Sequence, residues 1–510
     1  MKLPIGIQTF EKLRTENYAY VDKTKEAYEL INDYNYVFLA RPRRFGKSLF
    51  LDTLKCIFEG KKELFKGLYI YNKWNFEKYP VIKIDWAGEF KSFKSLRKRA
   101  KAILNNNQER LSVECKDEDA INCFEELIQK AYKKYQKRVV ILIDEYDKPI
   151  LDCIEDKKQA MENRDFLRGF YSIMKANDEY IKFAFLTGVS KFSKASIFSG
   201  LNMLVDISLM PKFGNICGIT QKEFEDNFDT DGVDLDKVKY WYNGYYFLKD
   251  KVYNPFDLLQ YLKNRKFKNY WFASGNPYFL MELIKKRKYN LVKLSNLIVD
   301  EKILDVFDVE RIDIEVLLYQ AGYLSIKDVI ESKRGTKYKL YFPNYEVKSS
   351  FNDYLIEYLI KDVEKEKNQD DLYEALLKGD IDYFISTLKR IFASIPYNNL
   401  TYIKGYEGFY ASVVYVYLQS LGFDIFGKDI TNKGRIDLSV FVEDKVYIIE
   451  FKVIDKKEAI AKDDCEALNQ IKERNYHEKY QNREVYLIGI CFSKKEKNIV
   501  DYEYESIKNV

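Results

Sequence analysis

Short apolar runs alternate with helical periodicity over the first two hundred residues. Residues 37–40, 80–86, 138–143 and 181–186 are rich in β-branched and aromatic residues, and each run ends at polar or charged positions. Continuous apolar runs of this length are typical of strands buried on both faces of a parallel sheet. The stretches between them repeat apolar residues at helical spacing. The pattern predicts an α/β fold, a parallel sheet with helices on both faces.

A glycine, a lysine and a serine follow the first apolar run and begin an amphipathic stretch. The order strand, loop, helix is typical of a P-loop, in which backbone N–H groups and the helix N-terminus face phosphates. Lys47 is expected to reach the β- and γ-phosphates, and Ser48 to bind Mg²⁺. The residues predicted to contact ATP here are Arg43, Arg44, Phe45, Gly46, Lys47, Ser48 and Leu49. Arg41 replaces the first glycine of the motif, so a chance Gly-Lys-Ser in a basic loop is the alternative.

Two later runs supply polar groups for the same site. The run at 138–143 ends at Asp144 and Glu145, about a hundred residues after Lys47, a usual spacing for a P-loop domain. Ligands of parallel sheets bind beyond the carboxyl ends of the strands. Asp144 is predicted to hold Mg²⁺ and Glu145 to polarise the attacking water. Thr187 ends the next run, where a polar residue can sense the γ-phosphate.

Composition excludes several classes of protein. The 510 residues are 46% hydrophobic and 32% charged, which is typical of a globular chain with several domains. The net charge of +5 is too small to indicate nucleic-acid binding by itself. Seven scattered cysteines without a C-x-x-C pair argue against zinc and against a disulfide framework. With no apolar leader or membrane-length run, a cytoplasmic location and no membrane partner are expected.

The single histidine, His477, limits the chemistry further. A Ser-His-Asp triad would have to use it, and nucleases with a histidine base are effectively excluded. Any hydrolysis must therefore rely on carboxylates, lysine and a metal ion.

The middle of the chain is aromatic and then highly charged. Residues 241–247 read as a turn between apolar flanks, and 253–256 as the start of a helix; both sets of aromatics are either core or pocket walls. A helix at 314–321 followed by two apolar segments with a polar tip at 331–336 predicts a winged-helix-like pattern. Residues 348–400 are expected to form a helical connector.

A second group of chemical residues lies near the C-terminus. A strand at 434–442 and a strand at 446–453 are predicted around a turn, with helices before and after them. Side chains alternate along a strand, so Glu450 and Lys452 lie on one face, within plausible reach of Asp437. Asp437 and Glu450 are predicted Mg²⁺ ligands, and Lys452 positions the nucleophile or steadies the transition state. Glu407 can add a ligand and Gln470 can orient the site. A solvated, charged hairpin is the alternative.

Together these motifs resemble the bacterial AAA-ATPase-like proteins that carry a C-terminal PD-(D/E)XK nuclease domain. The matching stretches are 4–6, 20–24, 41–48, 144–149, 187–190, 199–202, 253–256, 434–437 and 450–452. The family's P-loop also lacks the first glycine. The resemblance implies a P-loop ATPase domain over 1–290, a winged-helix-like and helical connector over 291–400, and a restriction-endonuclease-like α/β domain over 401–510.

The resulting hypothesis is an ATP- and Mg²⁺-dependent nuclease acting on nucleic acid, with DNA favoured and homo-oligomers allowed. A role in defence or mobile-element biology rests on analogy alone. One alternative is an ATP-switched nucleic-acid-binding or signalling protein that does not cut. A third is an ATPase whose C-terminal domain only mediates assembly.

Overall fold

The computed structural model describes residues 2–90, 92–192, 197–198, 201–274, 278–287, 289–304, 313–395, 407–430, 435–455, 466–480 and 482–507. The chain forms two compact units. The first contains Met1–Trp271, Val299–Lys327 and Glu331–Lys337. The second contains Phe272–Ile298, Asp328–Ile330 and Tyr338–Val510. The domain boundaries expected near residues 290 and 400 stay a prediction.

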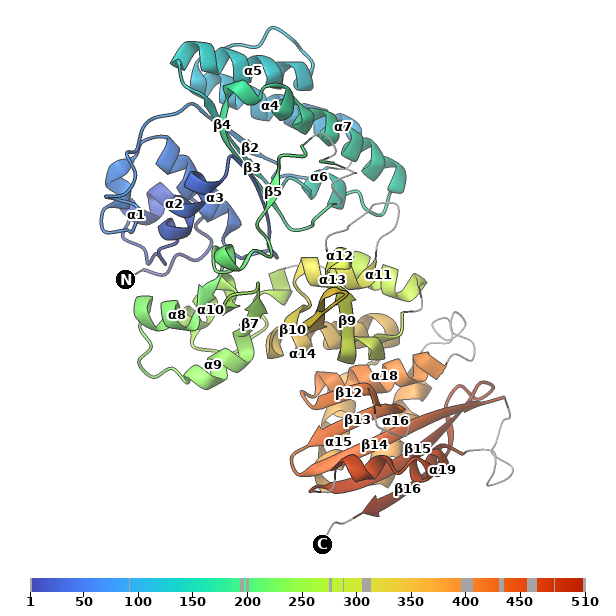
Figure 1. Cartoon of the computed structure of the whole chain (residues 1–510). Coiled ribbons are helices and arrows are strands. Elements are labelled where there is room, and N and C mark those ends of the chain that lie inside the picture. The colour runs from blue at the N-terminus through green and yellow to red at the C-terminus, as the bar shows by residue number, and fades with distance from the viewer. Residues whose placement is uncertain are drawn as a thin grey trace. The chain divides into compact units, whose positions relative to one another are not determined.

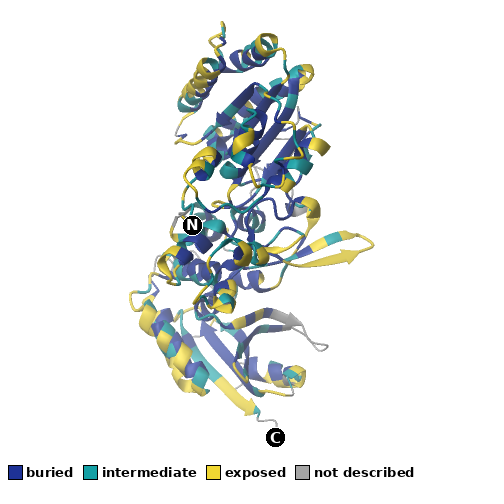
Figure 2. Ribbon diagram, turned by 90° about the vertical axis from the view of Figure 1, so that its left-hand side faces the viewer, coloured by how far each residue is buried: buried dark blue, intermediate teal, exposed yellow. Residues whose placement is uncertain are grey.

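A five-stranded parallel sheet forms the centre of the first unit, as the apolar runs predict. Its strands are β1 (Tyr36–Ala40), β2 (Val81–Asp85), β3 (Val139–Asp144), β4 (Ile181–Gly188) and β5 (Val205–Asp206). Their order is β2-β3-β4-β1-β5, so β4 lies between β1 and β3. The carboxyl end of β4 therefore separates the loop after β1 from the carboxylates after β3. Figure 2 shows most residues of β1, β2, β3 and β4 as buried, and both residues of β5 are half-buried.

Helices cover both faces of this sheet (Figure 1). On one side, Phe50 and Phe58 of α3 pack on Phe185 and Phe183 of β4, with ring centroids 5.7 and 5.4 Å apart. On the other side, α4, α5 and α7 pack together. The helices of this part are α1 (Phe10–Thr15), α2 (Thr24–Asp33), α3 (Lys47–Phe58), α4 (Phe93–Leu111), α5 (Ala120–Tyr135), α6 (Lys148–Leu151) and α7 (Lys157–Ala176).

A smaller substructure follows within the first unit. It has a three-stranded sheet in the order β6-β8-β7 and three short helices. The elements are β6 (Ile219–Thr220), α8 (Gln221–Asn227), α9 (Leu235–Tyr242), β7 (Asn243–Tyr246), β8 (Lys251–Tyr253) and α10 (Pro255–Asn264). The predicted turn at 241–247 is wrong, because α9 ends at Tyr242 and β7 follows at once. Its aromatic residues alternate between buried and half-buried, which is the pattern of a strand.

The winged-helix-like pattern corresponds to a helix followed by a hairpin. After β9 (Leu297–Asp300) and α12 (Glu301–Leu304), α13 (Ile314–Ala321) precedes β10 (Ser325–Ser332) and β11 (Gly335–Tyr341). The three strands form a sheet in the order β10-β11-β9. The polar tip predicted at 331–336 lies at the exposed turn of this hairpin.

The second unit contains a mixed five-stranded sheet in the order β12-β13-β14-β15-β16. Only the β14–β15 pair is parallel. The strands are β12 (Asp424–Ile430), β13 (Arg435–Val442), β14 (Lys445–Ile454), β15 (Glu484–Ser493) and β16 (Ile499–Ile507). The hairpin β13–β14 is as predicted, whereas β12, β15 and β16 were not identified from the sequence.

Helices complete this unit. The rings of Tyr410 and Phe392, from two of these helices, pack on Phe492 of β15 with centroids 4.4 and 5.0 Å apart. The helices are α11 (Tyr278–Lys286), α14 (Tyr345–Leu355), α15 (Lys365–Lys378), α16 (Ile381–Ser394), α18 (Glu407–Ser420) and α19 (Ala467–Glu473).

Two sequence expectations concern the environment of the chain. Among the described residues, no helix is long and apolar enough to cross a membrane. Five described cysteines are free thiols, and Cys491 on β15 is disulfide-bonded.

Candidate functional site

The loop between β1 and α3 has the form of a phosphate-binding loop. Gly46 caps α3 with a φ of +87°, a left-handed conformation that favours glycine. Lys47 is 8% exposed, and its Nζ donates to the carbonyls of Arg41 and Pro42, each at 2.9 Å. Burial lowers the pKa of Lys47, and the neighbouring Asp144 opposes that shift. A buried cation thus lies at the start of the helix, where anions bind.

Ser48 and Asp144 meet across the loop. The Asp144 carboxylate at the end of β3 is 2% exposed, and the Ser48 side chain is among the groups that act on it. Burial raises the pKa of Asp144, while the Ser48 hydroxyl and the Lys47 charge lower it. A hydroxyl and a carboxylate are hard oxygen donors of the kind that Mg²⁺ prefers, so these two residues fit the ion.

Glu145 follows in an unusual backbone conformation. Its φ is +52°, a backbone conformation that residues other than glycine rarely adopt. Its N–H donates to Asp144 Oδ1 at 3.0 Å. Burial, and then the charge of Asp144, raise the pKa of its carboxyl group. Strained backbone of this kind is frequent at functional sites.

Two polar residues lie near the carboxyl end of β4, one on that strand and one in the loop after β3. Thr187 is fully buried, and its hydroxyl donates to the Leu39 carbonyl at 2.9 Å. Its role as a γ-phosphate sensor stays a prediction. Asp147, which was not predicted as a site residue, accepts the N–H groups of Val189 and Ser190 at 3.0 and 2.6 Å. Asp147 therefore joins the ends of β3 and β4 beside the phosphate loop.

Arg41 supports the loop from beneath. Its side chain is 1% exposed, and Nη1 donates to the carbonyls of Ala40 and Ser208 at 2.9 and 2.7 Å. The guanidinium also lies 3.9 Å from the Phe247 ring centroid. These contacts tie the loop to the segment after β5 and to the end of β7. The residue that replaces the motif's first glycine is thus structural.

The remaining loop residues are distributed between solvent and packing. Arg43 and Arg44 are exposed, and the Arg44 guanidinium lies 4.5 Å from the Phe256 ring centroid. Phe45 is buried edge-on against Tyr245, with centroids 4.7 Å apart. Leu49 is half-buried in the first turn of α3. Of the aromatics that the sequence left as core or pocket walls, Tyr245, Phe247 and Phe256 pack directly on the phosphate loop.

The second site lies where the β13–β14 ladder ends. Regular pairing stops at Leu438 and Ile449, and side chains replace the next backbone bonds. The Asp437 N–H donates to Glu450 Oε2 at 3.2 Å, and the Phe451 N–H donates to Asp437 Oδ2 at 3.0 Å. Asp437 and Glu450 therefore lie side by side, as the sequence predicted.

Glu450 has a strongly raised pKa within this site. Burial and then the Asp437 carboxylate raise the pKa of Glu450 to about 8, while Lys452 and Arg474 oppose the shift. The side-chain amide of Gln470, on α19, donates to Glu450 Oε1. Arg474, one turn later, donates to the Tyr476 hydroxyl at 2.8 Å and was not identified from the sequence.

A divalent cation fits the pair of carboxylates chemically, because it would neutralise two adjacent negative groups. No group of three acidic, histidine or cysteine side chains suited to a metal is found in the part of the chain that the structure describes. Glu407 begins α18, but its side chain lies outside the described residues, as does that of His477.

Comparison with known proteins matches both sites to families. The profile of a predicted AAA-ATPase family matches residues 4–198, and that of the PD-(D/E)XK nuclease superfamily matches residues 405–502. A protein of Azotobacter chroococcum mcd 1, described as an uncharacterized protein in the vnfD 5′ region, is 41% identical over 517 residues, covering 99% of each chain. The chain belongs to the AAA-ATPase-like family with a C-terminal PD-(D/E)XK domain. The resemblance seen in the sequence is therefore confirmed.

The two family profiles of this AAA-ATPase-like protein each contain one of the two candidate sites. The first profile contains Lys47, Ser48, Asp144 and Glu145, and the second contains the paired carboxylates. At the level of families, the halves are ATPase-like and nuclease-like. The described relative adds no activity, because it is itself uncharacterized.

Proposed function

We propose that the first unit binds and hydrolyses Mg²⁺-ATP. The observation that carries this proposal is the buried ammonium of Lys47 at the N-terminus of α3, with the buried carboxylate of Asp144 acting on it from the end of β3. Lys47 neutralises the β- and γ-phosphates, and Ser48 and Asp144 hold Mg²⁺. Glu145 orients and polarises the water that attacks the γ-phosphorus, and Thr187 senses that phosphate.

The second unit, in this proposal, cuts nucleic acid with Mg²⁺. Asp437 and Glu450 would hold the ion, and the bound ion would supply an activated water and compensate charge on the phosphate. Lys452 steadies the negative charge of the transition state, and Gln470 fixes the orientation of Glu450 through its hydrogen bond. DNA is the favoured substrate, and defence or mobile-element biology the favoured setting, by analogy with the family.

One observation supports an alternative function. The described residues place only two acidic side chains at the second site, and a pKa of about 8 leaves Glu450 largely protonated at neutral pH without a cation. An ATP-switched protein that binds nucleic acid or signals without cutting would tolerate such a site.

The two functions are separated by one assay. Purified protein is incubated with ATP, Mg²⁺ and single- or double-stranded DNA or RNA, and phosphate release and cleaved strands are both measured. Cleavage supports the nuclease. Phosphate release without cleavage of any substrate supports the switch, and the absence of both contradicts the whole proposal.

A further inference from the structure

Two side chains from outside the parallel sheet hold one atom of the phosphate loop. Asn254 Nδ2 lies 3.4 Å and Trp271 Nε1 lies 3.2 Å from the carbonyl oxygen of Arg43. Asn254 is fully buried and Trp271 is 6% exposed. A carbonyl oxygen has two lone pairs and can accept both donors. The orientation of the Arg43 carbonyl is therefore fixed by two buried groups.

The geometry of a peptide bond transmits this orientation to the next residue. No described peptide bond is cis. In a trans peptide the carbonyl of Arg43 and the N–H of Arg44 point in opposite directions. Holding the carbonyl toward Asn254 and Trp271 directs the Arg44 N–H away from them. Backbone N–H groups turned in this way are what phosphate sites are built from.

Arg44 itself needs this support. Its φ of +68° is a left-handed conformation that costs a residue with a side chain more than it costs glycine. Its guanidinium stacks on Phe256, two residues after Asn254. One junction between a strand and a helix therefore holds both the Arg43 carbonyl and the Arg44 side chain.

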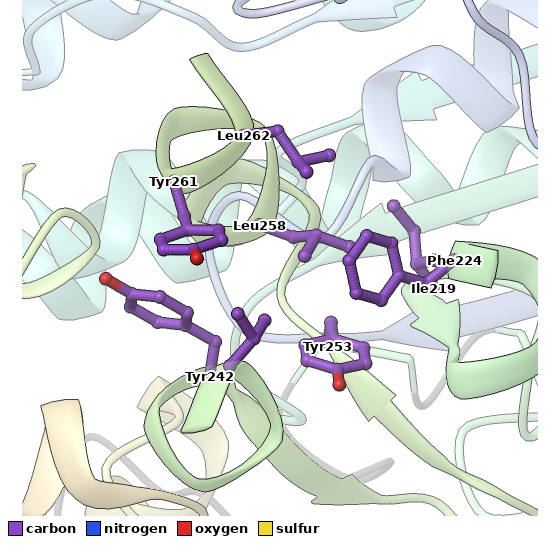
Figure 3. Packing of buried hydrophobic residues seen from close by; sticks show 8 residues of the cluster. Ile219, Phe224, Tyr242, Tyr253, Leu258, Tyr261 and Leu262 are labelled. Atoms are coloured by element: carbon purple, nitrogen blue, oxygen red, sulfur yellow. The ribbon is translucent and has the colours of Figure 1, made fainter. Parts of the chain in front are cut away.

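That junction is firmly anchored. Asn254 Oδ1 accepts the N–H of Phe256 at 2.9 Å and so caps α10. Tyr253 and Leu258, on either side of the cap, are buried in a cluster with Phe224, Tyr242 and Tyr261, whose side chains converge in Figure 3. The Tyr242 hydroxyl bonds both the N–H and the carbonyl of Lys268, three residues before Trp271.

We propose that Asn254 and Trp271 are positioning residues for the ATP phosphates. By holding the Arg43 carbonyl they turn the Arg44 N–H toward the β- and γ-phosphates. This inference rests on the proposed ATP site. It assigns a role in nucleotide binding to the segment from β7 to Trp271, whose aromatic residues the sequence left as either core or pocket walls.

The test uses variants that remove one donor each. Asn254→Ser keeps a hydroxyl able to cap α10 but lacks the amide donor, and Trp271→Phe keeps an apolar ring without the N–H. Asn264→Ser is the matched control, because Asn264 is exposed at the end of the same helix and bonds only within it. Affinities for ATP and for AMP are measured by calorimetry or competition on the full chain.

Each donor variant is expected to lower the affinity for ATP about fivefold to tenfold, which is the contribution of one hydrogen bond to a phosphate. The affinity for AMP should fall less than about twofold. The double variant should lose less than the product of the single losses, because both donors act on one carbonyl. Asn264→Ser should match wild type. Equal losses for ATP and AMP, or no loss for either, would overturn the inference.

Lys47→Ala separates this failure from failure of the ATP site. Suppose that the wild type binds ATP, that Lys47→Ala abolishes this binding, and that Asn254→Ser and Trp271→Phe bind ATP as the wild type does. This result overturns only the positioning role. ATP binding that is absent from wild type, or equal in Lys47→Ala, overturns the ATP site and the positioning role with it.

Discussion

Lys47 and Glu145 have different tasks at the same site, so their loss should have different kinetic effects. Lys47→Ala removes the buried cation of the proposed phosphate site and should lower the affinity for ATP on the order of 100-fold. Nucleotide affinity by calorimetry and phosphate release measure this. Wild-type hydrolysis by Lys47→Ala would show that the loop does not bind ATP phosphates.

Glu145→Gln should keep affinity and lose turnover. The amide preserves the size of the side chain, but it cannot polarise the attacking water, so the rate at saturating ATP should fall by about 100-fold or more. The affinity for ATP should change less than about threefold. A variant that turns over normally would remove Glu145 from the mechanism.

A variant of Arg41 tests the structural role of the residue that replaces the first glycine of the loop. Arg41→Gly removes the guanidinium donor from the carbonyls of Ala40, Ser208 and Phe213, and it removes the ring contact with Phe247. A loss of about 2–4 kcal/mol in the unfolding free energy of the first unit is expected. Denaturation followed by tryptophan fluorescence reports on this unit, because all four tryptophans lie within residues 1–271. Normal stability and ATPase activity would make Arg41 incidental.

Single residues also show what the sequence could and could not reveal. Lys47, Ser48 and Asp144 were predicted because the order of strand, loop and helix implies their meeting. The sequence shows Asn254 only as part of an aromatic stretch, because its contact with the Arg43 carbonyl spans 211 positions. Such a contact depends on tertiary packing, which no local pattern records.

At the scale of elements, continuous apolar runs were reliable and short or edge strands were not. The strands β1, β3 and β4 match their runs because buried parallel strands have a distinct composition. In contrast, β5 has two residues and β7 was read as a turn. In the strand β16 one residue of nine is buried, and the strand carries acidic residues, so its composition resembles a loop.

The end of the β13–β14 ladder gives a pH prediction. A folded pKa of about 8, raised above the ordinary value for glutamate, means that the folded unit holds a proton that the unfolded chain releases near pH 4.5. In chelator, the stabilisation that Glu450 contributes should therefore be complete below about pH 4.5 and be lost as pH rises toward 8, by on the order of 1 kcal/mol per pH unit.

Glu450→Gln should remove this slope, because the amide does not titrate. Hydrogen exchange of peptides covering β13 and β14, read by mass spectrometry between pH 5 and 9 with correction for intrinsic rates, measures it. Stability that rises over this range in wild type would contradict the buried, coupled carboxylate pair.

At the scale of the whole molecule, the two sites lie in different compact units and should fail independently. Asp437→Ala should remove cleavage and leave ATP hydrolysis without nucleic acid within about twofold of wild type, because no ATPase residue is touched. Loss of basal ATP hydrolysis in this variant would show that the sites form one catalytic system.

Cleavage of nucleic acid by the full-length protein with ATP and Mg²⁺ tests the central claim most directly. The account predicts cut strands from wild type, none with chelator, and none from the Asp437→Ala/Lys452→Ala double variant, whose basal ATP hydrolysis persists. Undiminished cutting by that double variant would contradict the assignment of the second site.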